Sequence, residues 1–201
     1  MKRWFTGLHN AIDYPLRRLF RWQRAGLSIR NENKENLFRN TSPELAESLR
    51  NRAYILNKQY HLQDLYAQST AKVYRINLYY LELLEQAVRQ THLTLPAGVH
   101  ALDVGCSDWF YVEALYRWIQ WQQTDTQREV QLTGYEADAY RVYRDFYSCM
   151  DYALWYSRNL EGVRYIPEPF TKTKTQYDLA FLFFPFIFLG DHQAWGLPDR
   201  M

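Results

Sequence analysis

The sequence predicts an α/β fold in which a helical region precedes a mostly parallel sheet. Helical periodicity runs through much of the first part of the chain, and short apolar runs then alternate with long helical patterns. Strands that alternate with helices imply crossover connections and therefore a parallel sheet. The runs are continuously apolar, as expected when both faces of a sheet are covered.

The composition indicates a well-filled core and a reducing compartment, the cytoplasm. Of the 201 residues, 47% are hydrophobic and 17% aromatic, which excludes an intrinsically disordered chain. Two cysteines, Cys106 and Cys149, are too few for a disulfide framework or a zinc site. The first thirty residues lack the apolar stretch of a secretory signal. The longest apolar run, 179–189, is about half the length of a membrane span.

Residues 1–30 are expected to form a basic arm. They hold seven Lys or Arg residues and one acid, Asp13, which gives this segment a charge of +6. Residues 31–201 carry −4, so the net charge of the whole chain is +2. Apolar residues at helical spacing between arginines predict an amphipathic helix over 4–24, which Pro15 should kink or split. Such a helix fits peripheral contact with an anionic membrane, or packing on the domain. The acidic remainder argues against a specific nucleic-acid partner.

A helical region should follow the polar linker at 30–36. Ser42 is the expected N-cap of its first helix, and Pro43 suits the first helical position. The helical pattern then continues with one or two breaks to about residue 90. We therefore divide the chain into a basic arm at 1–30, a helical region at 31–91 and a sheet domain at 92–201.

Four strands and two long helices are expected in the sheet domain. The strands are expected at 99–105, 129–136, 162–167 and 177–184, and the helices at 109–122 and 138–158. A short helix is expected near 192–195. Ligands of an open parallel sheet bind beyond the carboxyl ends of its strands. Residues at those ends are therefore candidates for a site.

Three of these strand ends carry candidate residues. Gly105 follows the first strand and permits a positive φ, while Ser107 or Asp108 is expected to cap the next helix. Glu136 ends the second strand, where a carboxylate can accept hydrogen bonds from two ribose hydroxyls. Glu168 follows the third strand at a rigid turn. Each residue alone also fits a purely structural role, and their placement at one edge favours a binding site.

Three segments, 101–116, 132–138 and 177–186, together resemble the S-adenosylmethionine-dependent methyltransferases of the Rossmann-like class. The resemblance extends over about residues 98–190 and implies S-adenosylmethionine as the cofactor. It implies cofactor contacts at Asp103, Gly105, Ser107, Glu136 and Glu168, with Asp103 and Gly105 shaping the methionine loop, Glu136 on the ribose and Glu168 beside the adenine. It implies an acceptor pocket lined by Phe184, Pro185 and Phe186.

The chain departs from the resembled family in three places. That family often has Asp in the turn beside the adenine, and the nearest match here falls on Pro169, one residue after Glu168. It also often has further glycines where this chain has Ser107 and Trp109. Its members that methylate base amines carry Asp or Asn before the residues matched by 184–186, and this chain has Phe183 there. We therefore expect no methylation of base amines, and the acceptor, a small molecule or another group, stays open.

The single glycine of the first turn favours S-adenosylmethionine over a dinucleotide. A pyrophosphate needs close approach to the backbone at a helix N-terminus, and Asp108 would repel it. S-adenosylmethionine carries no phosphate. Methyl transfer requires alignment of the reacting atoms, and a neutral hydroxyl acceptor also needs a general base. The candidates for that base are His192, Asp191 and His100.

Two functions remain open on the sequence. The retained Asp103, Gly105 and Glu136 favour a methyltransferase. The altered loop favours an inactive or truncated methyltransferase-like protein that acts as a binding or membrane-peripheral module. The resembled fold orders its strands 3-2-1-4-5-7-6, and this sequence supplies four. We therefore expect a truncated copy, or an exposed fourth-strand edge that an oligomer, another partner or the N-terminal helices cover.

Overall fold

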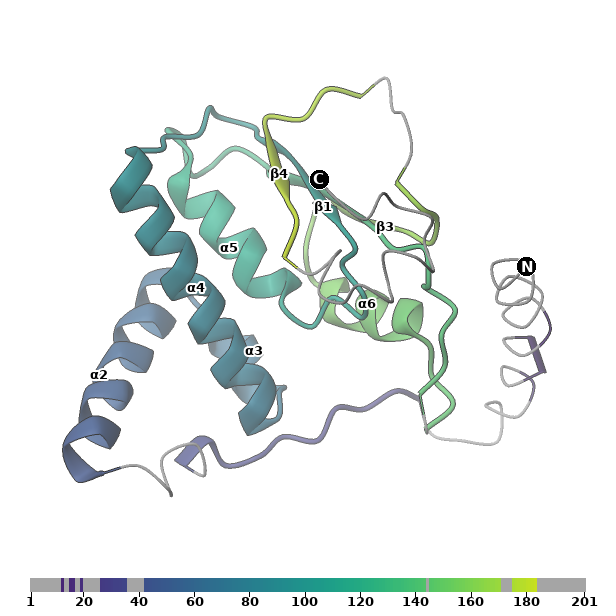
Figure 1. Cartoon of the computed structure of the whole chain (residues 1–201), viewed down its shortest axis with the longest axis horizontal. Coiled ribbons are helices and arrows are strands. Elements are labelled where there is room, and N and C mark those ends of the chain that lie inside the picture. Colours follow the sequence, from purple (N-terminus) through teal and green to yellow (C-terminus); the bar gives the residue numbers. More distant parts are fainter. Residues whose placement is uncertain are drawn as a thin grey trace, which may run out of the picture.

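In the computed structural model, the helices α2 to α4 precede a parallel sheet that has four strands within the described residues (Figure 1). The structure describes residues 12, 15, 16, 19, 26–35, 42–143, 145–170 and 175–183. The helices are α2 (Pro43–Tyr60), α3 (Gln63–Ala67) and α4 (Ala71–Thr91). The following elements are β1 (His100–Val104), α5 (Val112–Gln122), β2 (Gln131–Tyr135), α6 (Cys149–Ser157), β3 (Val163–Ile166) and β4 (Leu179–Phe181).

The sheet is entirely parallel and has the order β3-β2-β1-β4. Ala101 of β1 pairs with Leu132 of β2 on one side and with Leu179 of β4 on the other. The predicted α/β fold with an N-terminal helical region is therefore confirmed, and the four strands lie in the order that the resemblance implies. Because the strands are parallel, their carboxyl ends meet at one edge of the sheet.

The main core lies between the sheet and α5. The helix buries Val112, Leu115 and Ile119 at helical spacing, together with Trp118. These side chains belong to one cluster with Ala101 of β1 and Leu132 of β2. α5 also contacts α4 and α6, so it lies between them (Figure 1). The core thus joins the helical region to the sheet and holds the turn between β1 and α5 in place.

The helical region follows its predicted boundaries. Ser42 caps α2 by accepting the N–H of Leu45 at 3.4 Å, and Pro43 occupies the first position. His61 ends α2 and His92 ends α4, both with left-handed backbones. The short α3 lies between two breaks in the helical pattern, as the sequence predicts.

The helix expected at residue 109 begins three residues later, at Val112. Its N-cap is Tyr111, which makes no capping hydrogen bond through its side chain. The prediction that Ser107 or Asp108 caps this helix was therefore wrong. The backbone explains the difference, because Ser107 and Trp109 each have φ 52° and cannot belong to a right-handed helix.

The second long helix is also shorter than predicted. The expected span of 138–158 contains α6 only, and its described residues before Ser148 form turns with an antiparallel bridge between Val142 and Ser148. A capping box starts α6: Ser148 Oγ accepts the N–H of Asp151, and the Asp151 carboxylate accepts the N–H of Ser148. The serine and the acid three residues later can be read from the sequence. This capping box sets the start of α6, although a helical pattern also precedes it.

β4 lies at one edge of the described sheet. It has three residues and pairs with β1, and no second strand pairs with it within the described ranges. Phe181 points into the core, whereas Leu182, directly after the strand, is 56% exposed. The part of the predicted strand beyond residue 183 lies outside the described residues.

The predicted amphipathic helix at 4–24 falls mostly outside the described residues. Ile12, Pro15, Leu16 and Leu19 are described and are helical. The three aliphatic side chains among them are more than half exposed. None of the helices in the described ranges combines the length and the apolar content that a bilayer crossing requires.

Candidate functional site

Three predicted site residues lie at the carboxyl edge of the sheet. Gly105 follows β1, and its N–H donates to the carbonyl of Tyr135, the last residue of β2, at 2.8 Å. Glu136 follows β2, and its N–H donates to the carbonyl of Ile166 at 3.1 Å. Glu168 lies two residues beyond β3 and is exposed. The parallel sheet thus brings together residues that are distant in the sequence.

The turn after β1 is left-handed at three positions. Gly105 has φ 75°, and Ser107 and Trp109 have φ 52°. This conformation suits glycine and costs other residues about 1–2 kcal/mol. The two positions where the resembled family often has further glycines therefore adopt the backbone that glycine favours.

Glu136 ties this turn to the end of β2. Its side chain is nearly buried, with Oε2 accepting the N–H of Ser107 at 2.6 Å and Oε1 accepting the N–H of Asp138 at 2.8 Å. Burial raises the pKa of the carboxyl, and these two hydrogen bonds oppose the rise. A carboxylate has about four acceptor sites. Glu136 therefore keeps acceptor capacity for the hydroxyls of a ligand.

Asp103 holds the turn from below. Its carboxyl is completely buried, and Oδ2 accepts hydrogen bonds from Trp109 Nε1 and from the Tyr111 hydroxyl, both at 2.8 Å. Oδ1 is also buried and has no partner among the described residues. Burial raises the pKa of Asp103 to about 7. At neutral pH the Asp103 carboxyl is therefore partly protonated. A neutral carboxyl costs less free energy to bury than a carboxylate, which lowers the cost of leaving Oδ1 without a hydrogen-bond partner.

Trp109 fills the space above β2. Its indole is fully buried, and a Cβ on Gly134 would lie 2.7 Å from the ring and 2.9 Å from Cys106 Sγ. Gly134 is therefore required for this packing. The pair was not predicted from the sequence, although a glycine inside an apolar strand is a signal of close approach.

Ser107 is held by residues that sequence reasoning did not select. Arg141 Nη2 donates to Ser107 Oγ at 3.1 Å, and the Tyr165 hydroxyl donates to the Ser107 carbonyl at 2.8 Å. Asp108 accepts a hydrogen bond from the Tyr143 hydroxyl at 3.1 Å. Burial raises the pKa of Asp108. These contacts bring together segments that lie 34 to 58 residues apart, which local patterns cannot reveal.

No family model, curated protein or solved structure matches the chain.

The acids at this edge favour a ligand with hydroxyl groups and positive charge. Asp108, Glu136 and Asp138 surround the turn, and the Glu136 carboxylate already occupies the N–H of Ser107. A pyrophosphate would need such N–H groups and would be repelled by the carboxylates. The acids of this edge therefore favour a ligand with hydroxyl or cationic groups over one with phosphates.

The remaining predicted residues fall into two groups. His100 opens β1, so it lies about 13 Å along the strand from the carboxyl edge. Its N–H donates to Asp178 Oδ2 at 2.9 Å. This position at the opposite edge removes His100 as a general base for the site. The predicted acceptor residues Phe184, Pro185 and Phe186 and the base candidates Asp191 and His192 lie outside the described residues.

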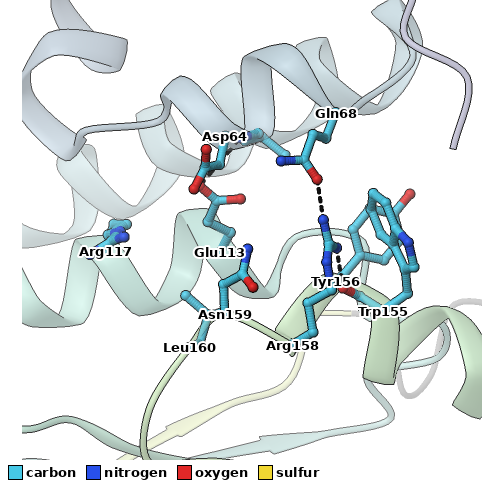
Figure 2. A pocket seen from close by; sticks show the side chains of 10 residues that line it. Asp64, Gln68, Glu113, Arg117, Trp155, Tyr156, Arg158, Asn159 and Leu160 are labelled. Atoms are coloured by element: carbon cyan, nitrogen blue, oxygen red, sulfur yellow. Dashed lines mark hydrogen bonds between the residues drawn. The ribbon is translucent and has the colours of Figure 1, made fainter. Parts of the chain in front are cut away.

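A separate pocket lies between α3, α5 and α6 (Figure 2). The Asp64 and Glu113 carboxyls point toward one another in it, and Glu113 Oε1 accepts the N–H of Leu65 at 3.3 Å. Burial raises the pKa of Glu113 to about 7, and the charge of Asp64 adds to the rise. On the other side, Arg158 stacks on Trp155 at 3.8 Å and donates to Gln68. These contacts fasten α3 to both neighbouring helices.

Proposed function

We propose that the chain is an S-adenosylmethionine-dependent methyltransferase whose cofactor site lies at the carboxyl ends of β1 and β2. The observation that carries this proposal is the position of Glu136. Its carboxylate ends β2, is nearly buried and bonds to the N–H of Ser107 in the left-handed turn after β1. A carboxylate in this place suits the two hydroxyls of a ribose.

Each residue of the edge has a distinct task in this proposal. Glu136 accepts hydrogen bonds from the ribose hydroxyls, and Glu168 lies beside the adenine. Gly105 and Ser107 bring the backbone close to the methionine end, with Asp103 holding the turn through Trp109 and Tyr111. S-adenosylmethionine, when bound, supplies a sulfonium methyl group that an acceptor displaces directly. The protein contributes mainly by aligning the two reactants.

Two observations favour a second function, a methyltransferase-like module that transfers nothing. Both oxygens of Glu136 already accept backbone N–H groups, and the residue is only 6% exposed. The Trp109 indole also fills the space above Gly134. In such a module this edge of the sheet would have a structural role only. Ligands or partners would bind to other surfaces of the protein.

Titration calorimetry with S-adenosylhomocysteine separates the two functions. We expect the wild-type protein to bind it, and Glu136→Gln to weaken binding by about 1.5–3 kcal/mol, or roughly tenfold to a hundredfold, because hydrogen bonds to a charged acceptor are lost. Glu129→Gln is the matched control, since Glu129 is exposed just before β2 at the opposite edge. A folded wild-type protein that binds nothing at millimolar ligand favours the module. Preferential binding of NAD would point to a dinucleotide site.

A further inference from the structure

The arm at 1–30 carries an apolar stripe that the rest of the protein leaves uncovered. Ile12, Leu16 and Leu19 are helical and follow one another at offsets of four and three residues, which places them on one face of a helix. Their exposed fractions are 54%, 52% and 69%. Single exposed apolar side chains are common on protein surfaces, whereas several on one helical face are typical of a surface that contacts another molecule.

The charge of the arm favours an anionic partner for this stripe. Residues 1–30 carry +6 and residues 31–201 carry −4. The helical spacing expected from the sequence places Arg17, Arg18 and Arg21 away from the stripe. An apolar face combined with a basic face is typical of a helix that lies in the headgroup region of an anionic membrane. The acidic remainder of the chain would be repelled by such a surface, so the arm would make the contact.

The segment that follows the arm is fixed to the helical region. Lys34 is only 4% exposed, and its ammonium group donates to the Ser69 carbonyl at 2.5 Å. It also donates to Asn31 Oδ1 at 2.8 Å and to the Glu32 carbonyl at 3.0 Å, which uses all three of its donors. Glu32 Oε2 accepts the N–H of Ala71, the first residue of α4, at 2.9 Å. A surface that binds the arm therefore also holds the helical region close to it.

We propose that the arm binds the surface of an anionic lipid bilayer, with Ile12, Leu16 and Leu19 at the acyl chains and the arginines at the lipid phosphates. This proposal is independent of the proposed function, because no residue at the carboxyl edge of the sheet takes part. Two other occupants of the stripe compete with lipid. They are a second copy of the chain and the acidic domain of the chain itself, and the exposure of the stripe argues against the domain.

Flotation of the full chain with vesicles tests the apolar contact. We expect binding to vesicles of phosphatidylcholine mixed with phosphatidylserine, and much weaker binding to phosphatidylcholine alone. Leu16→Gln combined with Leu19→Gln should lower the partition coefficient by about tenfold to a hundredfold, because less apolar surface leaves water on binding. The matched control is Leu45→Gln combined with Ile55→Gln. These α2 side chains are 52% and 57% exposed, and their replacement should leave the partition unchanged.

The contribution of charge is tested on the same vesicles. Arg18→Gln and Arg21→Gln should each lower the partition coefficient by about fivefold on the anionic vesicles, because each arginine near the surface contributes a similar attraction. On phosphatidylcholine alone both changes should have little effect. Equal binding of the wild-type protein to both kinds of vesicle would overturn the anionic surface as the partner.

The remaining outcomes also decide the proposal. A folded wild-type protein that does not float with either kind of vesicle overturns it. Binding that persists in the leucine variant, or that falls equally in the α2 control, overturns the apolar contact. Without vesicle binding, a dimer that the leucine variant abolishes in sedimentation identifies a second copy as the occupant, and a lower stability of that variant in urea identifies the domain. If the double variant does not fold by circular dichroism, Leu19→Gln alone changes the most exposed residue of the stripe. It should still weaken flotation, and an unchanged partition contradicts the proposal.

Discussion

At the scale of single residues, Trp109 and Gly134 depend on one another. Trp109 adopts a left-handed backbone, and its buried indole lies against the one residue of β2 that has no side chain. The indole N–H also donates to Asp103. Packing and this hydrogen bond offset the strain of the left-handed backbone. The turn therefore keeps its conformation with tryptophan at a position where glycine would relax it.

Gly134→Ala tests this pair directly. The added methyl group would lie 2.7 Å from the Trp109 ring, so we expect a loss of about 1–3 kcal/mol in the free energy of unfolding from overpacking. Urea denaturation measures the loss. Gly26→Ala is the control, because no atom lies within 4 Å of a Cβ there and its φ is not positive. A Gly134→Ala variant as stable as the control would contradict this packing.

At the scale of elements, capping decides where α6 begins. The described residues from Asp138 to Tyr147 form turns and a bridge from Val142 to Ser148, although the apolar residues recur at helical spacing. The reciprocal hydrogen bonds of Ser148 and Asp151 satisfy donors at the start of the helix. α6 thus begins where a side chain can accept one of its first backbone N–H groups. The tyrosines before it lie in a non-helical segment.

Ser148→Ala should therefore destabilise the protein by about 1 kcal/mol, the usual loss for a helix cap. Ser148 is completely buried, and its replacement by Ala removes the hydroxyl that accepts the N–H of Asp151. Thermal unfolding measures the effect. Ser42→Ala is the comparison, because that cap is exposed and its hydrogen bond is longer, at 3.4 Å. We expect the smaller effect at Ser42, and the reverse order would argue against the capping box.

At the scale of the whole molecule, buried acids link stability to pH. Burial raises the pKa of Asp103 in β1 and of Glu113 in the pocket beside α3 to about 7. The folded state therefore binds these protons more tightly than the unfolded chain, in which both carboxyls ionise near pH 4. Their contribution to stability is complete below about pH 4 and is lost as the pH rises toward 7 and beyond.

We expect the free energy of unfolding to fall between about pH 4 and pH 7, and both Asp103→Asn and Glu113→Gln to flatten this dependence. Urea denaturation at several pH values measures the slope for each variant. Burial also raises the pKa of Asp108 and Glu136, so part of the slope should remain in each single variant. A wild-type stability that rises over this range would show that these carboxyls are ionised at little cost in the folded protein.

The sequence by itself determined the class of the fold and the residues at the edge of the sheet. Apolar runs indicated the strands because parallel strands are buried on both faces. Ser42 and Pro43 marked the start of α2 because caps act locally. Gly105 and Glu136 could be placed at one edge because parallel strands share their direction.

Only the tertiary structure decided how the turn after β1 is built. The left-handed backbones of Ser107 and Trp109 persist because distant groups stabilise them: Glu136 accepts the N–H of Ser107, and Gly134 makes room for the indole. Arg141 reaches Ser107 across 34 residues of chain. Sequence patterns report the preferences of one segment, whereas strain is offset by contacts between segments. The conformation of this turn therefore depends on contacts that only the tertiary structure shows.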